Sequence, residues 1–563
     1  MSTVGVLIAI VCLLLVVISF KRRPEQRLDR IRATWAKPVD HPRRMAALVE
    51  SHASRIASTP GRRSLDHRTW ADLNLDDVFV ALDRTTSTLG QHALYHRLRS
   101  APVGDDLEAF EAMTERMRDD MLLRERAQIA LDRLQDPQGY DVWWLARPGA
   151  VEGRRWYSVF PLLTAAALVS IALSPFWPGL LLVMLVINLP MRYITDRQIG
   201  AIASSIRQCA SLIGTAGSFR FVAGDDVEPI ARVLRDDLPK LARLKWISSW
   251  ANGNPFMLSI NAARASIILS DLISSLYEYF NLFLLLDATG VYVGVRDLNT
   301  HRASLLRVTA AVGDIDAAIS VASYREGRED WTRPQFQPKG TAVFTDLRHP
   351  LIDDAVPNSI ELRPGCGVLV TGSNMSGKST FLRTVGVNAI LAQTLNTCLA
   401  REYAAPILDV RSCIGRSDDL LAGKSYYIVE VEALLHLVRL SESALPHLFL
   451  LDELFRGTNA VERIAAGQGV LQELLEGEQG RKPHLVIAAT HDGELVGLLP
   501  EFYDACHFGD SIGSNGLAFD YRLRPGPATT RNALALLKQY GAPQRLLNRA
   551  TATAAILDQQ RNS

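Results

Sequence analysis

The stretch Val368-Leu-Val-Thr-Gly-Ser-Asn-Met-Ser-Gly-Lys-Ser-Thr380 decides the fold of the C-terminal part of this sequence. Its first residues form a short apolar run typical of a β-strand, and the residues from Thr380 onward are typical of a helix. Gly-x-x-x-x-Gly-Lys-Ser between a strand and a helix is the phosphate-binding loop pattern, in which backbone N–H groups and the helix N-terminus face phosphate oxygens. We therefore predict a nucleotide-binding site in an α/β domain. A chance match in a glycine-containing turn is the alternative.

The residues of this loop have separate expected roles. Lys378 would reach the β- and γ-phosphates of ATP, and the hydroxyl of Ser379 would bind Mg²⁺. The predicted ATP-binding residues of the loop are Gly372, Ser373, Asn374, Met375, Ser376, Gly377, Lys378, Ser379 and Thr380.

Two further predicted strands end in polar residues that could act on the same nucleotide. The apolar run 447–451 ends in Asp452 and Glu453, and the run 484–490 is followed by His491. We expect Asp452 to hold the metal and Glu453 to polarise the attacking water as the general base. A His at the carboxyl end of a sheet strand points at the ligand crevice and could sense the γ-phosphate. The predicted catalytic residues are Lys378, Glu453 and His491.

From residue 341 onward, predicted strands and helices alternate, which is typical of a mostly parallel sheet covered by helices. The stretch before it has the spacing of helices, and residues 331–340, with two prolines, form a linker between them. We predict an α/β phosphate-loop ATPase domain with a parallel-rich sheet, preceded by an all-α core domain that carries transmembrane helices.

Composition narrows the class of protein. The 563 residues allow three or four domains, and the net charge of +1 gives no global basic field of the kind that nucleic-acid binders carry. Six cysteines are scattered without paired spacing, which argues against a zinc site and a disulfide framework and favours a reducing compartment.

Three apolar stretches have the length and flanks of membrane segments. Residues 4–20 precede Lys21-Arg22-Arg23, which predicts an anchor with these basic residues on the cytoplasmic side; a cleaved signal peptide is the alternative. Residues 156–173 and 176–189 predict a transmembrane hairpin with arginines on both flanks. Three crossings predict a multi-pass cell-membrane protein whose ATPase domain is cytoplasmic. A fourth apolar stretch, 267–295, contains three acidic residues, and we predict a core helix there.

The segment 21–72 is basic, with 13 Lys and Arg against 6 Asp and Glu. Anionic lipid could attract it, because it lies beside the predicted anchor. A flank that only sets membrane topology and a DNA-contacting patch are the two other interpretations.

Four motifs resemble, in the same order, those of the MutS family of mismatch-repair ATPases over about residues 341–545. They are Gly372–Thr380, Ile414–Leu420 with Gly423–Ser425, Asp452–Thr458 and Ala489–His491. Arg348-His349-Pro350 is similar to the start of that family's ATPase domain. Residues 73–100 and about 200–330 show a looser similarity to its helical core domain.

The resemblance implies an ABC-like ATPase that uses ATP and Mg²⁺ and works as a homodimer. Ser425 would close over the γ-phosphate held by the partner chain, and Arg456 would lie at the same interface. The family's Thr after this serine is Tyr426 here. Taken together, the apolar stretches, the basic segment and the resemblance predict a transmembrane anchor (1–20), a basic juxtamembrane segment (21–72), a first helical core segment (73–150), a transmembrane hairpin (156–191), a second helical core segment (192–335) and the ATPase domain with a C-terminal helical dimerisation element (341–545).

Mismatch sensors of this family wedge a Phe from a Phe-x-Glu motif beside the mispair, and the sequence contains no such motif. Our first hypothesis is a membrane-anchored MutS-like ATPase that binds duplex DNA without that wedge. The second is a nucleotide-dependent membrane scaffold or transport-linked ATPase with no DNA partner.

Overall fold

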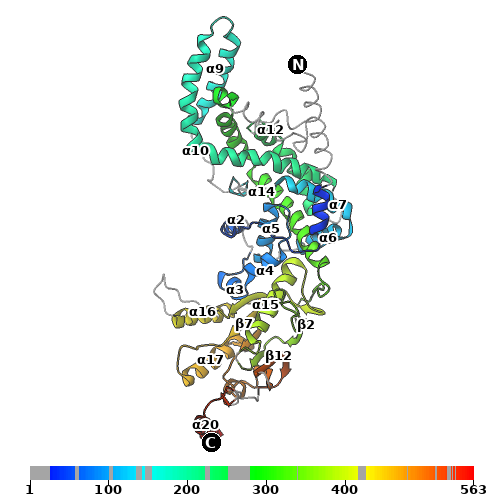
Figure 1. The fold of residues 1–563 in the computed structure, drawn as a ribbon, viewed down its shortest axis with the longest axis vertical. Coiled ribbons are helices and arrows are strands. Elements are labelled where there is room, and N and C mark those ends of the chain that lie inside the picture. Colours follow the sequence, from blue (N-terminus) through cyan, green and yellow to red (C-terminus); the bar gives the residue numbers. More distant parts are fainter. Residues whose placement is uncertain are drawn as a thin grey trace. The chain divides into compact units, whose positions relative to one another are not determined.

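The structure is a computed structural model, and its described residues form two compact units (Figure 1). The helical unit comprises Met1–Gly61, Leu82–His96 and Glu108–Gly327, and the α/β unit comprises Arg62–Ala81, Arg97–Leu107 and Arg328–Ser563. The described residues are 26–57, 63–100, 106–134, 142–145, 155–221, 228–251, 279–338, 340–373, 375–415, 426–477, 480–513, 516–528, 534, 537–538 and 540–562.

Helices alone build the described part of the helical unit. They are α2 (Met45–Ala57), α5 (Thr88–Arg99), α6 (Asp106–Asp119), α7 (Met121–Leu131), η1 (Asp132–Leu134), α8 (Val142–Leu145), η2 (Arg155–Ser158), α9 (Val159–Leu173), α10 (Gly179–Ser218), η3 (Phe219–Phe221), α11 (Glu228–Asp236), η5 (Pro239–Leu241), α12 (Ala242–Ala251) and α14 (Leu286–Glu326).

The 41-residue helix α14 supplies much of the core of this unit. Small and branched side chains recur along its second half at helical spacing and are buried, among them Val312, Ile315 and Ile319. Asp316 on the same helix accepts hydrogen bonds from the backbone N–H of Thr86 at 2.8 Å and of Ser87 at 2.7 Å. It thereby satisfies donors in the turn that precedes α5.

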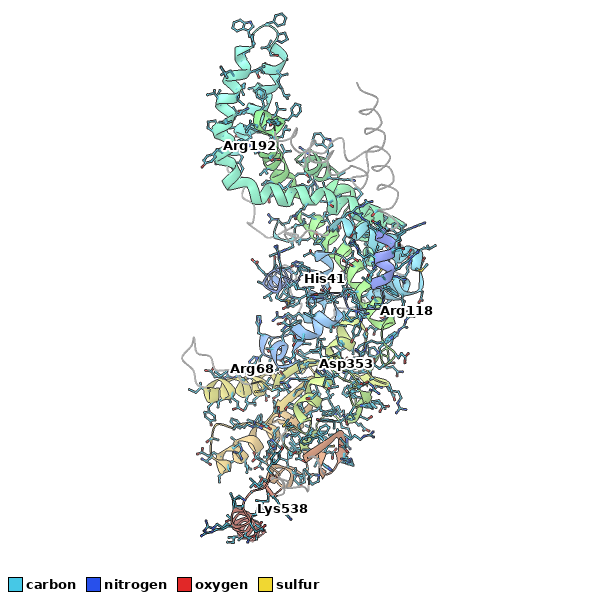
Figure 2. All side chains as sticks on the ribbon, viewed as in Figure 1. His41, Arg68, Arg118, Arg192, Asp353 and Lys538 are labelled. Carbon is cyan, nitrogen blue, oxygen red and sulfur yellow. The ribbon has the colours of Figure 1, made fainter. Side chains whose placement is uncertain are left out.

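Helix α9 and the first part of α10 form an antiparallel pair (Figure 1), and many of its exposed side chains are apolar. Its large exposed apolar side chains include Leu162, Leu168, Val169, Phe176, Trp177, Leu182, Val183, Val186 and Leu189. We call this pair, residues 159–189, the apolar hairpin. Arg192, labelled in Figure 2, follows it on α10.

The prediction of three transmembrane segments is supported for one of them. Among the described residues, the single helix long and apolar enough to cross a membrane is Trp156–Leu173, with a mean hydropathy of 1.8, whereas Gly179–Tyr193 is a shorter apolar helix. Residues 1–20 lie outside the described residues. Of the stretch 267–295, the described part includes the start of α14, where Val291 and Val295 are buried.

Two larger sheets and their helices form the α/β unit. The six-stranded sheet has the order β12-β11-β4-β10-β7-β6, the four-stranded sheet the order β1-β5-β2-β3, and β8 pairs with β9. The strands are β1 (Gln335–Phe336), β2 (Ala342–Leu347), β3 (Asn358–Leu362), β4 (Gly367–Thr371), β5 (Glu402–Ala405), β6 (Asp409–Cys413), β7 (His447–Asp452), β8 (Glu476–Gly477), β9 (Gly480–Arg481), β10 (Leu485–Ala489), β11 (Tyr503–Gly513) and β12 (Gly516–Pro525). The helices are α3 (His67–Asp72), α4 (Leu75–Leu82), α15 (Lys378–Leu395), α16 (Tyr426–Leu440), α17 (Ala460–Leu475), α18 (Glu494–Leu498) and α20 (Gln544–Asn562).

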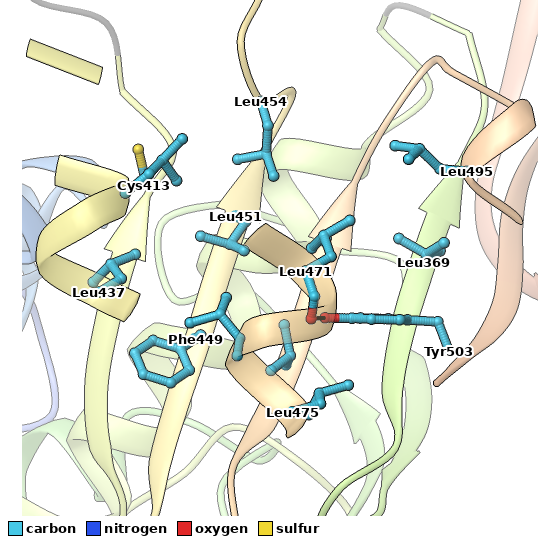
Figure 3. Packing of buried hydrophobic residues seen from close by; sticks show 14 of the residues in the cluster. Leu369, Cys413, Leu437, Phe449, Leu451, Leu454, Leu471, Leu475, Leu495 and Tyr503 are labelled. Carbon is cyan, nitrogen blue, oxygen red and sulfur yellow. Dashed lines mark hydrogen bonds between the residues drawn. The ribbon is translucent and has the colours of Figure 1, made fainter. Parts of the chain in front are cut away.

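Side chains from the six-stranded sheet and α17 form a buried core, shown in Figure 3. Strands β4 and β10 are buried along their whole length, as expected for central parallel strands that are covered on both faces. Tyr503 lies in this core and donates its hydroxyl hydrogen to Leu471 O at 2.7 Å. The predicted fold class is therefore confirmed in its coarser form: a helical N-terminal region and mixed α/β sheets in the C-terminal half.

Candidate functional site

The carboxyl ends of three adjacent parallel strands meet at the candidate site. β10 lies between β4 and β7, in a register that places Ala489 opposite both Val370 and Asp452. Glu453 N donates to Ala489 O at 2.9 Å, and Thr490 N donates to Val370 O at 3.0 Å. The loops that follow these strands therefore start side by side, where ligands bind in open α/β sheets.

The loop 372–377 has the backbone that a phosphate cradle needs. Gly372 has a φ of +144° and Gly377 a φ of +107°, conformations that L side chains rarely adopt. The hydroxyls of Ser373 and Ser376 are buried without a hydrogen-bond partner. Buried donors without partners fit the oxygens of a phosphate group, which would accept from them. Asn374, also predicted in this loop, lies outside the described residues.

Lys378 begins α15, so its ammonium group lies at the mouth of the loop. Its Nζ donates to Gly372 O and to Ser373 O, each at 3.0 Å. The residue is only 4% exposed. Burial lowers the pKa of Lys378 to about 8, although the nearby charge of Asp452 acts to raise it. A buried ammonium held by carbonyl oxygens can exchange them for phosphate oxygens, which carry more negative charge.

Ser379 and Asp452, the predicted metal ligands, are in contact. Ser379 Oγ donates to Asp452 Oδ2 at 2.5 Å, and Asp452 Oδ1 is buried without a hydrogen-bond partner. Burial raises the pKa of the Asp452 carboxyl, and the hydrogen bond from Ser379 opposes that rise. A hydroxyl beside a carboxylate oxygen that still has room for a ligand fits Mg²⁺, which prefers oxygen ligands. Since no three His, Cys, Asp or Glu side chains gather as a metal cluster in the described part of the chain, the other ligands would be phosphate and water.

Glu453, the predicted general base, is held by two basic side chains. Its Oε1 lies 2.6 Å from His491 Nε2, and its Oε2 contacts the guanidinium of Arg456. The short contact requires a hydrogen on Nε2 when the imidazole is neutral, so this nitrogen cannot also accept from Lys378 Nζ, 3.3 Å away. Burial, and next the charge of Lys378, lower the pKa of His491. A neutral His491 can therefore donate from Nε2 to Glu453 and orient its side chain.

The turn after β7 has an unusual backbone that a distant glutamate supports. Glu453 and Phe455 have φ values of 55° and 56°, in the left-handed region that non-glycine residues seldom adopt. Phe455 N donates to Glu430 Oε1 at 2.8 Å, and Glu430 is 4% exposed. Glu430 lies on α16, which starts directly after the predicted Ser425. This helix therefore helps to fix the position of the general base.

A pocket of about 680 Å³ opens beside the loop and has the size of a small-molecule site. Lys378, Ser379 and Glu453 line its polar side. The rest of its lining is mixed, with Ile352, Val356, Met375, Phe508 and Tyr521 beside the polar His349, Asp353, Asp354 and Asn358. The pocket thus offers both polar and apolar surface next to the phosphate loop.

The structure brings together most of the residues that were predicted from the sequence. The loop residues, Asp452, Glu453 and His491 meet at one place, whereas Ser425 lies outside the described residues. Sequence reasoning missed the contact of Glu430 and the pocket wall formed by Val356 and Tyr521. A Glu within the apolar run of α16 was a signal for the first of these, because charged residues are rarely buried without a partner.

Comparison with known proteins agrees with this geometry. Residues 368–558 match the family model described as MutS domain V. The chain is 32% identical over 278 residues to a DNA mismatch repair protein MutS of Thermus thermophilus, and 33% identical over 270 residues to the one of Thermus aquaticus. It is 31% identical over 271 residues to DNA mismatch repair protein MutS 2 of Halobacterium salinarum.

These alignments cover 48%, 46% and 46% of this chain, and 33%, 32% and 30% of the three relatives. The chain thus spans about a third of the length of the curated relatives that it matches. The similarity therefore concerns the ATPase half of the chain.

The lowered pKa of Lys378 predicts a pH dependence of nucleotide affinity. Phosphate favours the charged ammonium and would raise this pKa in the complex, so ATP binding should take up a proton above about pH 8. Affinity should then fall as the pH rises through 8, by at most about tenfold per pH unit. Calorimetric titration in two buffers of different ionisation enthalpy measures both quantities.

Lys378→Arg is the matched control, since a guanidinium keeps its charge over this range. Whatever nucleotide affinity this variant retains, that affinity should not fall as the pH rises through 8. An affinity of the unaltered protein that stays constant between about pH 7 and 9 would contradict the assignment.

Proposed function

Because residues 368–558 are a MutS-type domain V, we propose that this chain binds ATP with Mg²⁺ and hydrolyses it at the site described above. The observation that carries the proposal is the cluster of Lys378, Ser379, Asp452, Glu453 and His491 at the carboxyl ends of adjacent strands. MutS-family proteins are ATPases, and this arrangement supplies every group that phosphoryl transfer to water needs from one chain.

Each residue has a role in the proposed reaction. The loop N–H groups and Lys378 hold the phosphates, and Ser379 and Asp452 hold Mg²⁺, which neutralises charge on the phosphate oxygens. Glu453 takes a proton from the attacking water, and His491, 2.6 Å from it, keeps the carboxylate in position.

We place the working state in a homodimer formed through the ATPase domain, with Ser425 reaching the γ-phosphate of the partner. Large apolar side chains near the site are exposed and support an interface there. They include Met375 in the loop, Ile428 on α16 and Val461 at the start of α17. On α20, Leu546 and Ile556 are also exposed, in keeping with a terminal dimerisation element.

The apolar hairpin supports attachment to a membrane. Leu162, Phe176 and Leu182 are 70%, 80% and 66% exposed, and no charged residue lies between Trp156 and Leu189. In water such a surface is unfavourable, by about 25 cal/mol per Å², whereas lipid tails would cover it. We therefore propose a membrane protein with its ATPase domain in the cytoplasm and residues 1–20 as a further anchor.

The substitutions Lys378→Ala and Glu453→Gln test the proposed ATPase. Lys378→Ala should remove nucleotide binding. Glu453→Gln should keep binding but slow hydrolysis by roughly 100-fold or more, the usual contribution of a general base, and should accumulate as an ATP-bound dimer in size-exclusion chromatography. Normal turnover by Glu453→Gln would overturn the general-base assignment, and Asp77→Asn, an exposed carboxylate in the same unit, is the control.

Cysteine labelling tests the membrane attachment. Leu162→Cys and Leu182→Cys in native membranes should resist a water-soluble maleimide until detergent is added, because lipid covers these positions. Leu498→Cys, which replaces a side chain 46% exposed in the α/β unit, should react in both conditions. Equal labelling of all three without detergent would show that water, and not lipid, surrounds the hairpin.

Whether the ATPase binds DNA distinguishes the two candidate functions. The relatives are named as DNA mismatch repair proteins, so we propose duplex DNA as a partner, in a mode that does not use a Phe-x-Glu wedge. The apolar hairpin favours the second candidate, a nucleotide-dependent membrane scaffold or transport-linked ATPase without DNA. If DNA is the partner, duplex should change the ATPase rate, and its affinity should fall steeply with salt. An identical ATPase rate with homoduplex, mismatched, branched and no DNA would favour the second function.

A further inference from the structure

A helix from the N-terminal region of the chain covers the open edge of the ATPase sheet. β6 is the last strand of the six-stranded sheet and pairs on one side with β7. The N–H groups of alternate residues point away from β7 and need acceptors. Ser412 N donates to Thr69 Oγ1 at 3.1 Å, and Ile414 N donates to Asp72 Oδ2 at 2.9 Å. Two side chains of α3 thus take the place of a neighbouring strand.

Asp72 makes further contacts at the end of β6. Its Oδ2 also accepts from Ser412 Oγ at 2.8 Å, and its Oδ1 accepts from Gly415 N at 2.8 Å. The side chain lies so close that a Cβ at Gly415 would be 2.5 Å from Oδ1. One carboxylate, 7% exposed, therefore fixes the backbone of the last described residues before the predicted Ser425 segment.

The same residue is tied to the helix that carries the phosphate-binding lysine. Arg383 Nε donates to Asp72 O at 2.7 Å, and Arg383 lies five positions after Lys378 on α15. The next residue, Leu73, is fully buried against Gly386 of this helix, where a Cβ would meet Leu73 Cδ2 at 2.9 Å. Residues 72 and 73 thus contact both α15 and the end of β6.

We propose that Asp72 is a positioning residue that relays the nucleotide state of the site to α3 and α4. When phosphates bind at the start of α15, this helix moves relative to β6 or tightens against it, and Asp72 carries the change because it is bonded to both. The chain leaves α4 at Leu82 and continues into the helical unit, so this segment is one of the covalent connections between the α/β unit and the helical unit. The inference rests on the proposed ATP binding.

If α3 only covers the edge of the sheet, it would make the same contacts, but its amide exchange would not change when nucleotide binds. Amide hydrogen exchange of the full-length protein, with and without Mg²⁺ and a non-hydrolysable ATP analogue, distinguishes the two. In the unaltered protein, the analogue should slow exchange in residues 378–388 and also in residues 66–81. The second effect should be about fivefold or more, the lower end of coupling between linked sites.

Asp72→Asn should separate the slowed exchange in residues 378–388 from the slowed exchange in residues 66–81. An amide NH₂ cannot accept from Ile414 N, so the link to β6 is weakened while the helix contact through Asp72 O remains. We expect the analogue to bind within about threefold of its normal affinity and to slow exchange in 378–388 only. Arg383→Leu breaks the link from the other side and should give the same result. Asp77→Asn, on α4 but with its side chain exposed, should behave as the unaltered protein.

Two results would overturn the relay. One is binding of the analogue to the unaltered protein without any change in 66–81, and the other is a full change there in both Asp72→Asn and Arg383→Leu. Failure of the unaltered protein to bind the analogue would instead remove the proposed ATPase function, and the relay with it.

Discussion

Parallel pairing of β4, β10 and β7 is the constraint on which the site depends. These strands run in the same direction and in register. The loop that begins at Gly372, the pair Asp452-Glu453 and His491 therefore follow them at the same end of the sheet, the carboxyl end of the strands. These three segments are far apart in sequence, and no single one would bind a nucleotide. The buried apolar strands fix the distances between the segments that follow them, and so they also fix the distances between the polar residues of the site.

The charged groups of the site are partnered with one another. Lys378 is held by carbonyl oxygens of the loop, Asp452 by Ser379, and Glu453 by His491 and Arg456. Leaving such groups buried without partners would cost several kcal/mol each. A ligand at this site must therefore replace existing contacts, and one with several anionic oxygens and a divalent cation can do so, because it offers each group a stronger partner of the opposite charge.

The sequence was informative where function requires a local pattern. The phosphate loop, the acidic pair after an apolar strand and the His after another are each recognisable within about ten residues, and the structure places them together. Asp72 could not be found this way, since its partner Gly415 lies 343 positions away and a single Asp in a short helix carries no distinguishing pattern. Glu430 stood out as a charge within an apolar run, but its partner, 25 positions away, could not be read from that pattern. Apolar length alone predicted three membrane segments. One of them, Trp156–Leu173, has the length and hydropathy of a crossing helix in the described part of the chain, whereas residues 1–20 lie outside that part and stay a prediction.

The contact between α3 and β6 also constrains the order in which the protein can fold during its synthesis. Asp72 leaves the ribosome 343 residues before Gly415, its hydrogen-bond partner. At the usual elongation rates this interval is roughly 20 to 70 seconds. During that time α3 and α4 have no sheet to pack on, and their buried side chains, such as Leu75, are open to chaperones or to other nascent chains. The α/β unit is thus finished only when an early segment of the chain returns to it.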